Sequence, residues 1–327
     1  MLDGHRLIAG DRAPLKITGE ARRRLSRRPV PAPLLIADVP WLLYRSFFAL
    51  PKSIVGADGT PVNALLGTVN ALLSAEDALA AGGGARAIVA CMGAEEATYR
   101  VALYPPYHAH REPMPPELRA QWGAARELLE SFRWTYASDD QLEADDVMFS
   151  YARAEEARGG RALLITGDRD LYGAVSDSVS VLELRKGGAV GEIGPAQVRE
   201  RYGVEPEQVA DFIALRGDPS DGLPGARGIG AKTAAQLLRD HGNLETLLEL
   251  VHNQPAHAAH ALTPRTRGAL LEGAEELRAF KQIATLQRIA VRAPRDRASD
   301  YAAGAEHAER LGMRALAKRL RSITART

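Results

Sequence analysis

Acidic residues follow short apolar runs at several places in this chain of 327 residues. The run 34–37 is followed by Asp38, and the run 162–167 by Asp168, with Asp170 two residues later. If these runs are parallel strands, their carboxyl ends meet at one edge of a sheet, which is where α/β proteins bind ligands. Carboxylates gathered there would repel one another unless a cation lay among them.

Two further acidic segments extend this pattern. Residues 143–146 (Glu-Ala-Asp-Asp) open an amphipathic helix, and Asp218 and Asp221 lie in a turn rich in glycine and proline. Carboxylate oxygens are preferred ligands of Mg²⁺ and Mn²⁺, and a pair of such ions suits phosphodiester cleavage. Acidic residues at 143–146 also fit a helix N-terminus, which the dipole favours by about 0.3–1 kcal/mol. Together with the strand ends, they favour a metal site.

Composition limits the class of protein. Hydrophobic residues make up 46% of the chain and the net charge is +1, so a nucleic-acid-binding surface must be local. The single cysteine, Cys91, excludes an internal disulfide and fits a reducing cytoplasm. No run of about 18 apolar residues exists, so we expect no membrane span. We therefore expect a cytoplasmic protein.

Strand and helix patterns alternate over the first two thirds of the chain. Strands are predicted near 34–38, 86–91, 162–166 and 179–184. Helices are predicted near 63–80, 121–132, 145–158 and 195–202. This alternation predicts an α/β fold with a mostly parallel sheet flanked by helices. The proline-rich segment 99–119 predicts a functional loop or short arch.

We divide the chain into three parts. Residues 1–33 are basic and rich in proline, which predicts a disordered lead-in. Residues 34–194 form the catalytic α/β domain, and 195–327 form a helical module with periodic apolar residues in 231–250, 265–288 and 305–321. The last helix has a basic face, which we expect to be solvated; its members are Arg310, Arg314, Lys318, Arg319 and Arg321.

A glycine-rich turn joins two helical patterns in the module. Gly228 and Gly230 allow close approach of another backbone, and the helix that follows from Ala231 presents free N–H groups, to which Lys232 adds a positive charge. The order G-x-x-G-x-G after a helix argues against a dinucleotide fingerprint. Taken alone, a purely structural helix-turn-helix remains an alternative for this motif.

At this point the sequence resembles the 5′-nuclease family, which includes the exonuclease domain of bacterial DNA polymerase I, stand-alone 5′ exonucleases and flap endonucleases. The matching segments, in order, are 35–38, 43–45, 143–146, 166–171, 217–225 and 228–234. The resemblance implies a PIN-like α/β domain, a helix-three-turn-helix DNA-binding module, and cleavage of DNA near a free 5′ end or flap with two Mg²⁺ or Mn²⁺ ions.

The resemblance also implies roles for individual residues. The metal-site carboxylates would be Asp38, Glu143, Asp145, Asp146, Asp168, Asp170 and Asp221. The DNA backbone would be bound by Gly225, Gly228, Ile229, Gly230, Lys232 and Thr233, with a K⁺ ion at the turn. Arg100 and Arg111 match basic residues near the scissile phosphate, and His108 stands in the place of a lysine there. We expect a monomer.

Two departures from the family pattern stand out. Gly93 occupies the position of an aspartate at the end of the second core strand, and His108 replaces the arch lysine. Both changes point to a slower enzyme or an altered metal requirement. We expect Gly93→Asp to strengthen metal binding, and we expect His108 either to act as the missing cation below about pH 6.5 or to be an exposed loop residue.

Two alternatives stay open at this stage. The first is a non-catalytic, structure-specific DNA-binding protein that keeps the fold while Gly93 and His108 disable chemistry. The second is an RNA-directed nuclease of PIN type, against which the glycine turn argues because its backbone donors suit a duplex phosphate track.

Overall fold

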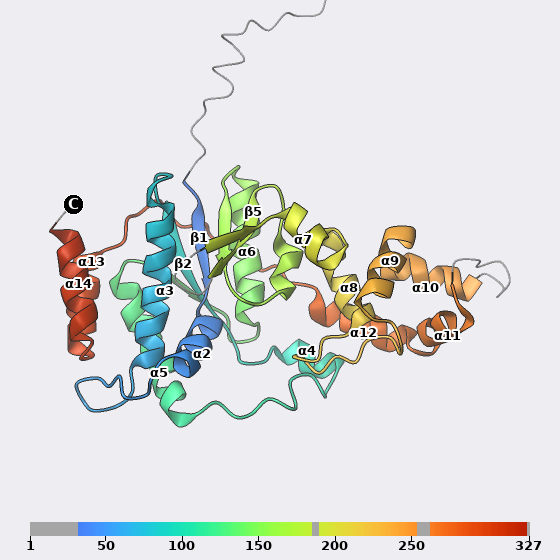
Figure 1. Cartoon of the computed structure of the whole chain (residues 1–327), viewed down its shortest axis with the longest axis horizontal. Helices are drawn as coiled ribbons and strands as arrows, with labels where there is room; N and C mark the ends of the chain where they lie inside the picture. Colours follow the sequence, from blue (N-terminus) through green and yellow to red (C-terminus); the bar gives the residue numbers. More distant parts are fainter. Residues whose placement is uncertain (1–31, 185–189, 254–261, 326–327) are drawn as a thin grey trace, which may run out of the picture. The chain divides into compact units, whose positions relative to one another are not determined.

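The strands form one six-stranded sheet in the part of the chain that the computed structural model describes, residues 32–184, 190–253 and 262–325 (Figure 1). Their order is β3-β2-β1-β4-β5-β6. The parallel strands are β1 (Leu34–Asp38), β2 (Ala87–Met92), β3 (Thr135–Ser138), β4 (Ala162–Ile165) and β5 (Val179–Leu184). β6 (Val190–Ile193) pairs antiparallel with β5. This confirms the mostly parallel sheet.

Alternation along β1 explains why the sheet is covered on both faces. Leu34 and Ile36 face one core together with α6 (Ala144–Ala157), whereas Leu35 and Ala37 face another with α2 (Val39–Ala49), α3 (Asn63–Ala80) and α5 (Pro116–Ser131). All five residues of β1 are buried, as expected for a strand in the middle of a parallel sheet. The paired register places Asp38 opposite Cys91, at the carboxyl edge.

The helical module follows α7 (Pro195–Tyr202). It contains α8 (Val209–Arg216), α9 (Ala231–His241), α10 (Leu244–Asn253), α11 (Pro264–Glu272) and α12 (Ala274–Ala284). The periodic stretches 231–250 and 265–288 are each two helices, separated near Gly242 and Gly273. Residues 286–300 then run without helix or strand.

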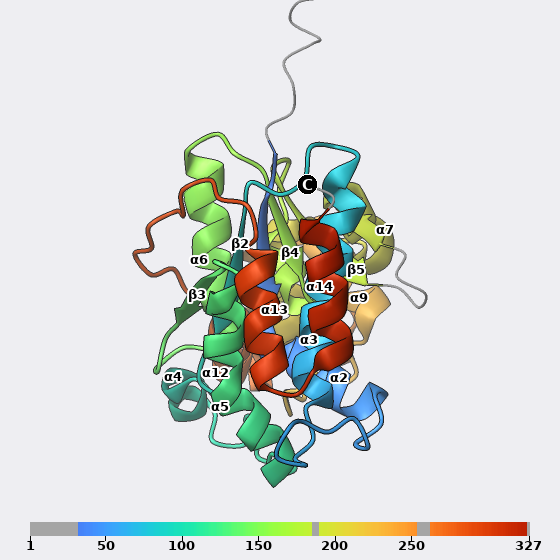
Figure 2. The same cartoon turned by 90° about the vertical axis from the view of Figure 1, so that its left-hand side faces the viewer.

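The last two helices lie apart from the helical module, which corrects the expectation for 195–327. α13 (Tyr301–Arg310) and α14 (Arg314–Thr324) replace the single helix expected over 305–321, because the chain turns at Gly312 with φ +82°. Their apolar residues join the core of α2, α3 and α5, and Figure 2 shows both helices beside α3 and α5. The exposed basic residues of α14 therefore lie on the α/β domain and not on the helical module.

Four α-helices and strands in the described part of the α/β domain are not predicted from the sequence. α2 directly follows β1, β3 and β6 have only four residues each, and α4 (Thr98–Leu103) lies inside the predicted arch. The lead-in expected over 1–33 falls almost entirely outside the described residues. None of the described helices is long and apolar enough to cross a membrane.

Candidate active site

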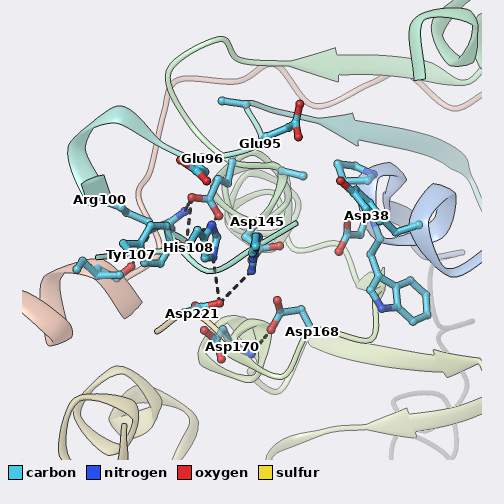
Figure 3. Close-up of a pocket in the computed structure, with 18 of the residues that line it drawn as sticks. Asp38, Glu95, Glu96, Arg100, Tyr107, His108, Asp145, Asp168, Asp170 and Asp221 are labelled. Atoms are coloured by element: carbon cyan, nitrogen blue, oxygen red, sulfur yellow. Dashed lines mark hydrogen bonds and ion pairs between the residues drawn. The ribbon is translucent and has the colours of Figure 1, made fainter. Parts of the chain in front are cut away.

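A pocket of about 580 Å³ lies at the carboxyl edge of the sheet, where β1 and β4 end (Figure 3). It contains six of the seven carboxylates predicted as metal ligands, namely Asp38, Glu143, Asp145, Asp168, Asp170 and Asp221. They come from the end of β1, the start of α6, the segment after β4 and the turn after α8. The fold thus brings together residues that are far apart in the sequence.

Asp38 caps α2 from the end of β1. Its Oδ1 accepts from the Trp41 N–H at 2.9 Å, and its Oδ2 accepts from Thr166 Oγ1 at 2.7 Å. Burial raises the pKa of Asp38 to about 7, helped by the charges of Asp168 and Glu143 and opposed by these two hydrogen bonds. A buried carboxylate this costly to ionise is stabilised when a cation shares its site.

The neighbouring aspartates are also costly to ionise. Burial raises the pKa of Asp145, Asp168 and Asp170, and repulsion from nearby carboxylates raises each further. Among the described residues, no three acidic, histidine or cysteine side chains form a preassembled metal-binding group. The oxygen donors nevertheless fit Mg²⁺ or Mn²⁺, because Mg²⁺ usually keeps several waters between itself and a protein.

Asp146 does not line this pocket, although we predicted it as a metal ligand. It is fully buried behind Asp145, and its Oδ1 accepts from Arg100 Nη2 at 3.0 Å and from the Gln287 N–H at 2.7 Å. Adjacent residues on a helix point about 100° apart, so Asp145 and Asp146 cannot face the same site. Asp146 instead holds Arg100 and the chain that follows α12.

Arg100 is buried in ion pairs rather than free to meet a phosphate. Its Nη1 lies 3.0 Å from Glu143 Oε1, and its Nε donates to the Ile283 carbonyl at 3.0 Å. Only 4% of the residue is exposed. Arg100 lines the pocket, and the geometry allows it to hold Glu143 in place.

His108 is buried against Asp221, which excludes the interpretation of an exposed loop residue. Its Nε2 lies 3.1 Å from Asp221 Oδ1, its backbone N–H donates to the Asp221 carbonyl at 3.1 Å, and its ring stacks on Tyr107 at 3.7 Å. Arg111 Nη2 donates to the same Asp221 oxygen at 3.1 Å. Burial raises the pKa of Asp221, but the His108 contact and the Arg111 charge outweigh it and leave that pKa below its usual value.

Gly93 leaves no room for an aspartate side chain unless the neighbouring backbone shifts. A Cβ at this position would lie 2.5 Å from backbone atoms of Leu142, Glu143 and Ala144, closer than real Cβ contacts allow. An aspartate here would therefore require the start of α6 to shift, since the end of β2 packs directly against it, and the effect of Gly93→Asp on metal binding stays a prediction. Two residues that we missed, Glu95 and Glu96, line the same pocket just beyond Gly93.

An aromatic edge also borders the pocket. Tyr44 stacks with Phe48 at 6.4 Å and meets Trp122 edge-on at 6.1 Å, and Phe48 is 72% exposed. Of the three tryptophans, Trp134 is buried in the core, whereas Trp41 and Trp122 line the pocket. Exposed aromatic rings of this kind can stack on nucleic-acid bases.

The glycine turn lies between α8 and α9, outside the pocket. Gly225 has φ +68°, and a Cβ there would lie 2.3 Å from the Gly217 nitrogen, so Gly225 shapes the turn. Ile229 is only 4% exposed and anchors the turn in the core. The other predicted DNA-binding residues, Gly228, Gly230, Lys232 and Thr233, are exposed.

Two family models match the chain. Residues 33–203 match the N-terminal resolvase-like domain of 5′-3′ exonucleases, and residues 204–298 match their C-terminal SAM fold. A 5′-3′ exonuclease of Mycobacterium tuberculosis is 34% identical over 316 residues, covering 88% of this chain and 96% of the relative. One from Streptomyces coelicolor is 39% identical, covering 73% of this chain and 80% of the relative.

A DNA polymerase and a solved nuclease structure are also similar to this chain. The thermostable DNA polymerase I of Thermus thermophilus is 40% identical over 218 residues, but this chain spans only 25% of its length. The T5 D15 flap endonuclease, solved with DNA and metal ions, superposes with a TM-score of 0.60 at 20% identity, covering 89% of this chain and 98% of that one. The order of the carboxylates, the sheet, the helical module and these relatives lead to one conclusion: the chain belongs to the 5′-3′ exonuclease family.

Proposed function

We propose that this protein is a metal-dependent 5′-3′ exonuclease or flap-type nuclease that hydrolyses DNA phosphodiester bonds near 5′ ends. The observation that carries the proposal is the pocket of one buried and five half-buried carboxylates. The raised pKa values of Asp38, Asp145 and Asp170 make these three unfavourable as bare anions. Such a site is stabilised by divalent cations, and oxygen donors select Mg²⁺ or Mn²⁺. The related T5 enzyme was solved with metal ions.

The pocket residues have distinct parts in this proposal. Asp38, Asp145, Asp168, Asp170 and Asp221 would hold two ions. Bound ions of this type lower the pKa of a water and stabilise a leaving oxygen. Glu143 is kept in place by the Ala97 N–H at 2.9 Å and by Arg100. The Arg111 side chain is 47% exposed, so it is the arginine placed to meet a phosphate.

We infer the substrate contacts from the surfaces around the pocket. The aromatic edge of Tyr44, Phe48 and Trp122 would stack on bases of an unpaired strand, and the glycine turn would bind the phosphates of a duplex, with K⁺ at its carbonyls. We further propose a monomer, which sedimentation would test, in a reducing cytoplasm, in line with the single buried cysteine Cys91.

The test is cleavage of a 5′-flap DNA duplex with Mg²⁺, Mn²⁺ or EDTA. We expect cutting only with metal, and a loss of at least 100-fold in Asp168→Ala, because that residue is central to the carboxylate group. Asp240→Ala is the matched control, since Asp240 lies on the exposed face of α9 and should leave the rate unchanged. Tight binding without cutting in either metal would contradict the nuclease and favour a structure-specific binding protein. Preferential cutting of single-stranded RNA would contradict the DNA substrate.

A further inference from the structure

The basic residues of the helical module divide into those with a protein partner and those without. Four have partners within 3.0 Å: Arg216 on Asp218, Arg239 on the Gly203 carbonyl, Arg278 on Glu245 and Lys281 on Asp211. Arg227 and Lys232, both exposed on the glycine turn, make no hydrogen bond or ion pair with any described residue. These four side chains thus have protein acceptors, whereas the two cations on the turn have none among the described residues.

Arg265 is a third unpaired cation at this turn, although it comes from a distant helix. A Cβ built on Gly228 would lie 3.2 Å from both Nε and Nη2 of Arg265, so the guanidinium rests directly over the bare backbone of that glycine. Arg265 is exposed and has no partner within the described ranges. Arg265 lies outside the glycine motif, so no pattern in the sequence indicates its contact with the turn.

The position of Arg265 is unfavourable unless an anion binds there. Thr263 caps α11 by accepting from the Thr266 N–H, and Pro264 is its first residue, so Arg265 lies in the first helical turn. The positive end of the helix dipole opposes a cation at this place, and α11 has no acidic residue in its first turn. Gathering three unpaired cations around one turn also costs free energy. A bound polyanion would offset both the unfavourable helix dipole and the repulsion among the three cations.

We propose that Arg265 binds a backbone phosphate of the DNA duplex together with the turn residues Gly228 and Lys232. The planar guanidinium can donate two hydrogen bonds to one phosphate, and the absent side chain of Gly228 leaves room for the guanidinium to lie against the turn. The contact would be independent of base sequence. This inference rests on the proposed function and adds a residue of α11 to its duplex-binding surface.

The experiment measures affinity for a 5′-flap duplex in EDTA by fluorescence anisotropy between 50 and 200 mM NaCl. We expect Arg265→Ala to weaken binding several-fold at every base sequence and to reduce the slope of log K against log salt by about 0.9. Arg265→Lys should keep most of the slope, because it keeps the charge. Arg239→Ala, which removes the same charge from a paired position, should leave the slope unchanged. A thermal unfolding curve for each variant checks that it is folded.

Two outcomes would overturn the inference in different ways. If Arg265→Ala keeps the slope of the unmodified protein while Lys232→Ala lowers it, Arg265 is not a phosphate contact and the proposed function stands. If the unmodified protein shows no salt-dependent binding to the duplex at all, the proposed function fails with it. A loss of slope in Arg239→Ala equal to that in Arg265→Ala would show a general charge effect and would also contradict the inference.

Discussion

Individual residues of the pocket decide how the protein responds to pH. The raised pKa of Asp38, about 7, means that the folded state without metal disfavours the ionised carboxylate, mainly because of burial. A group whose pKa is raised on folding stabilises the fold at low pH, and this contribution is lost as the pH rises through the folded-state pKa. Asp145, Asp168 and Asp170 shift in the same direction.

We therefore expect the metal-free protein to lose stability between pH 5 and pH 8. The effect of Asp38 alone is at most a few kcal/mol, at about 1.4 kcal/mol for each pKa unit. Thermal unfolding in EDTA across this range measures it, and Asp38→Asn should flatten the profile. Saturating Mn²⁺ should reverse the trend, because a bound cation favours the ionised carboxylates. A profile in EDTA that rises with pH would contradict the burial argument.

Gly93 is a position at which the surrounding backbone leaves no room for a side chain. The backbone atoms 2.5 Å from its missing Cβ cannot move away without shifting the start of α6. We expect Gly93→Ala to lower the free energy of unfolding by more than about 2 kcal/mol, in the range of overpacked cores, as measured by urea denaturation. Gly123→Ala is the matched control: nothing lies within 4 Å of its Cβ in α5, so it should stabilise by up to about 1 kcal/mol. Equal changes in the free energy of unfolding for Gly93→Ala and Gly123→Ala would refute this steric explanation.

At the scale of elements, prediction from sequence works where the pattern is long and fails where the chain is short or broken. β1 and α3 appear as predicted because their apolar patterns cover whole elements. Gly242 and Gly312 divide helices that the periodicity alone makes continuous. Five of the six pocket carboxylates can be predicted from positions after strands or at a helix start, and Asp221 from its turn rich in glycine and proline. The inward direction of Asp146 cannot be predicted in this way, because it depends on the packing of α12.

Arg100 links three elements, α4, α6 and α12, through Glu143, Asp146 and the Ile283 carbonyl. Removing one partner of a buried ion pair leaves an uncompensated charge. We expect Arg100→Leu to cost about 3–5 kcal/mol in urea unfolding, and the double change Arg100→Leu with Asp146→Leu to recover part of that loss. If the double variant loses more free energy of unfolding than the two single variants lose together, this account of the pair is contradicted.

At the scale of the whole molecule, the chain returns to its first layer after the helical module. Residues 286–300 lead from α12 to α13, and Arg86 fixes this segment by donating to the Pro294 carbonyl at 2.8 Å. α13 and α14 then complete the core around α5, with Phe132 packed where Gly304 has no side chain. Sequence reasoning could not place these two helices, because their amphipathic pattern does not say which layer they cover.

This placement predicts a separation of stability from DNA binding. Leu320 is fully buried in the core shared by α14 and the first layer. Leu320→Ala should cost about 2–5 kcal/mol while leaving the salt dependence of duplex binding unchanged below the unfolding transition. Urea denaturation and anisotropy on the same preparation measure the two effects. A changed salt slope would mean that α14 itself contacts DNA.

The two ends of the sheet have a further consequence for how the protein behaves in solution. Both outer strands, β3 and β6, have only four residues. A free outer strand offers unpaired backbone groups to another chain, and a short one offers few of them. The protein should therefore resist aggregation through strand pairing, so that concentrated preparations stay dispersed even when neither nucleic acid nor metal is bound.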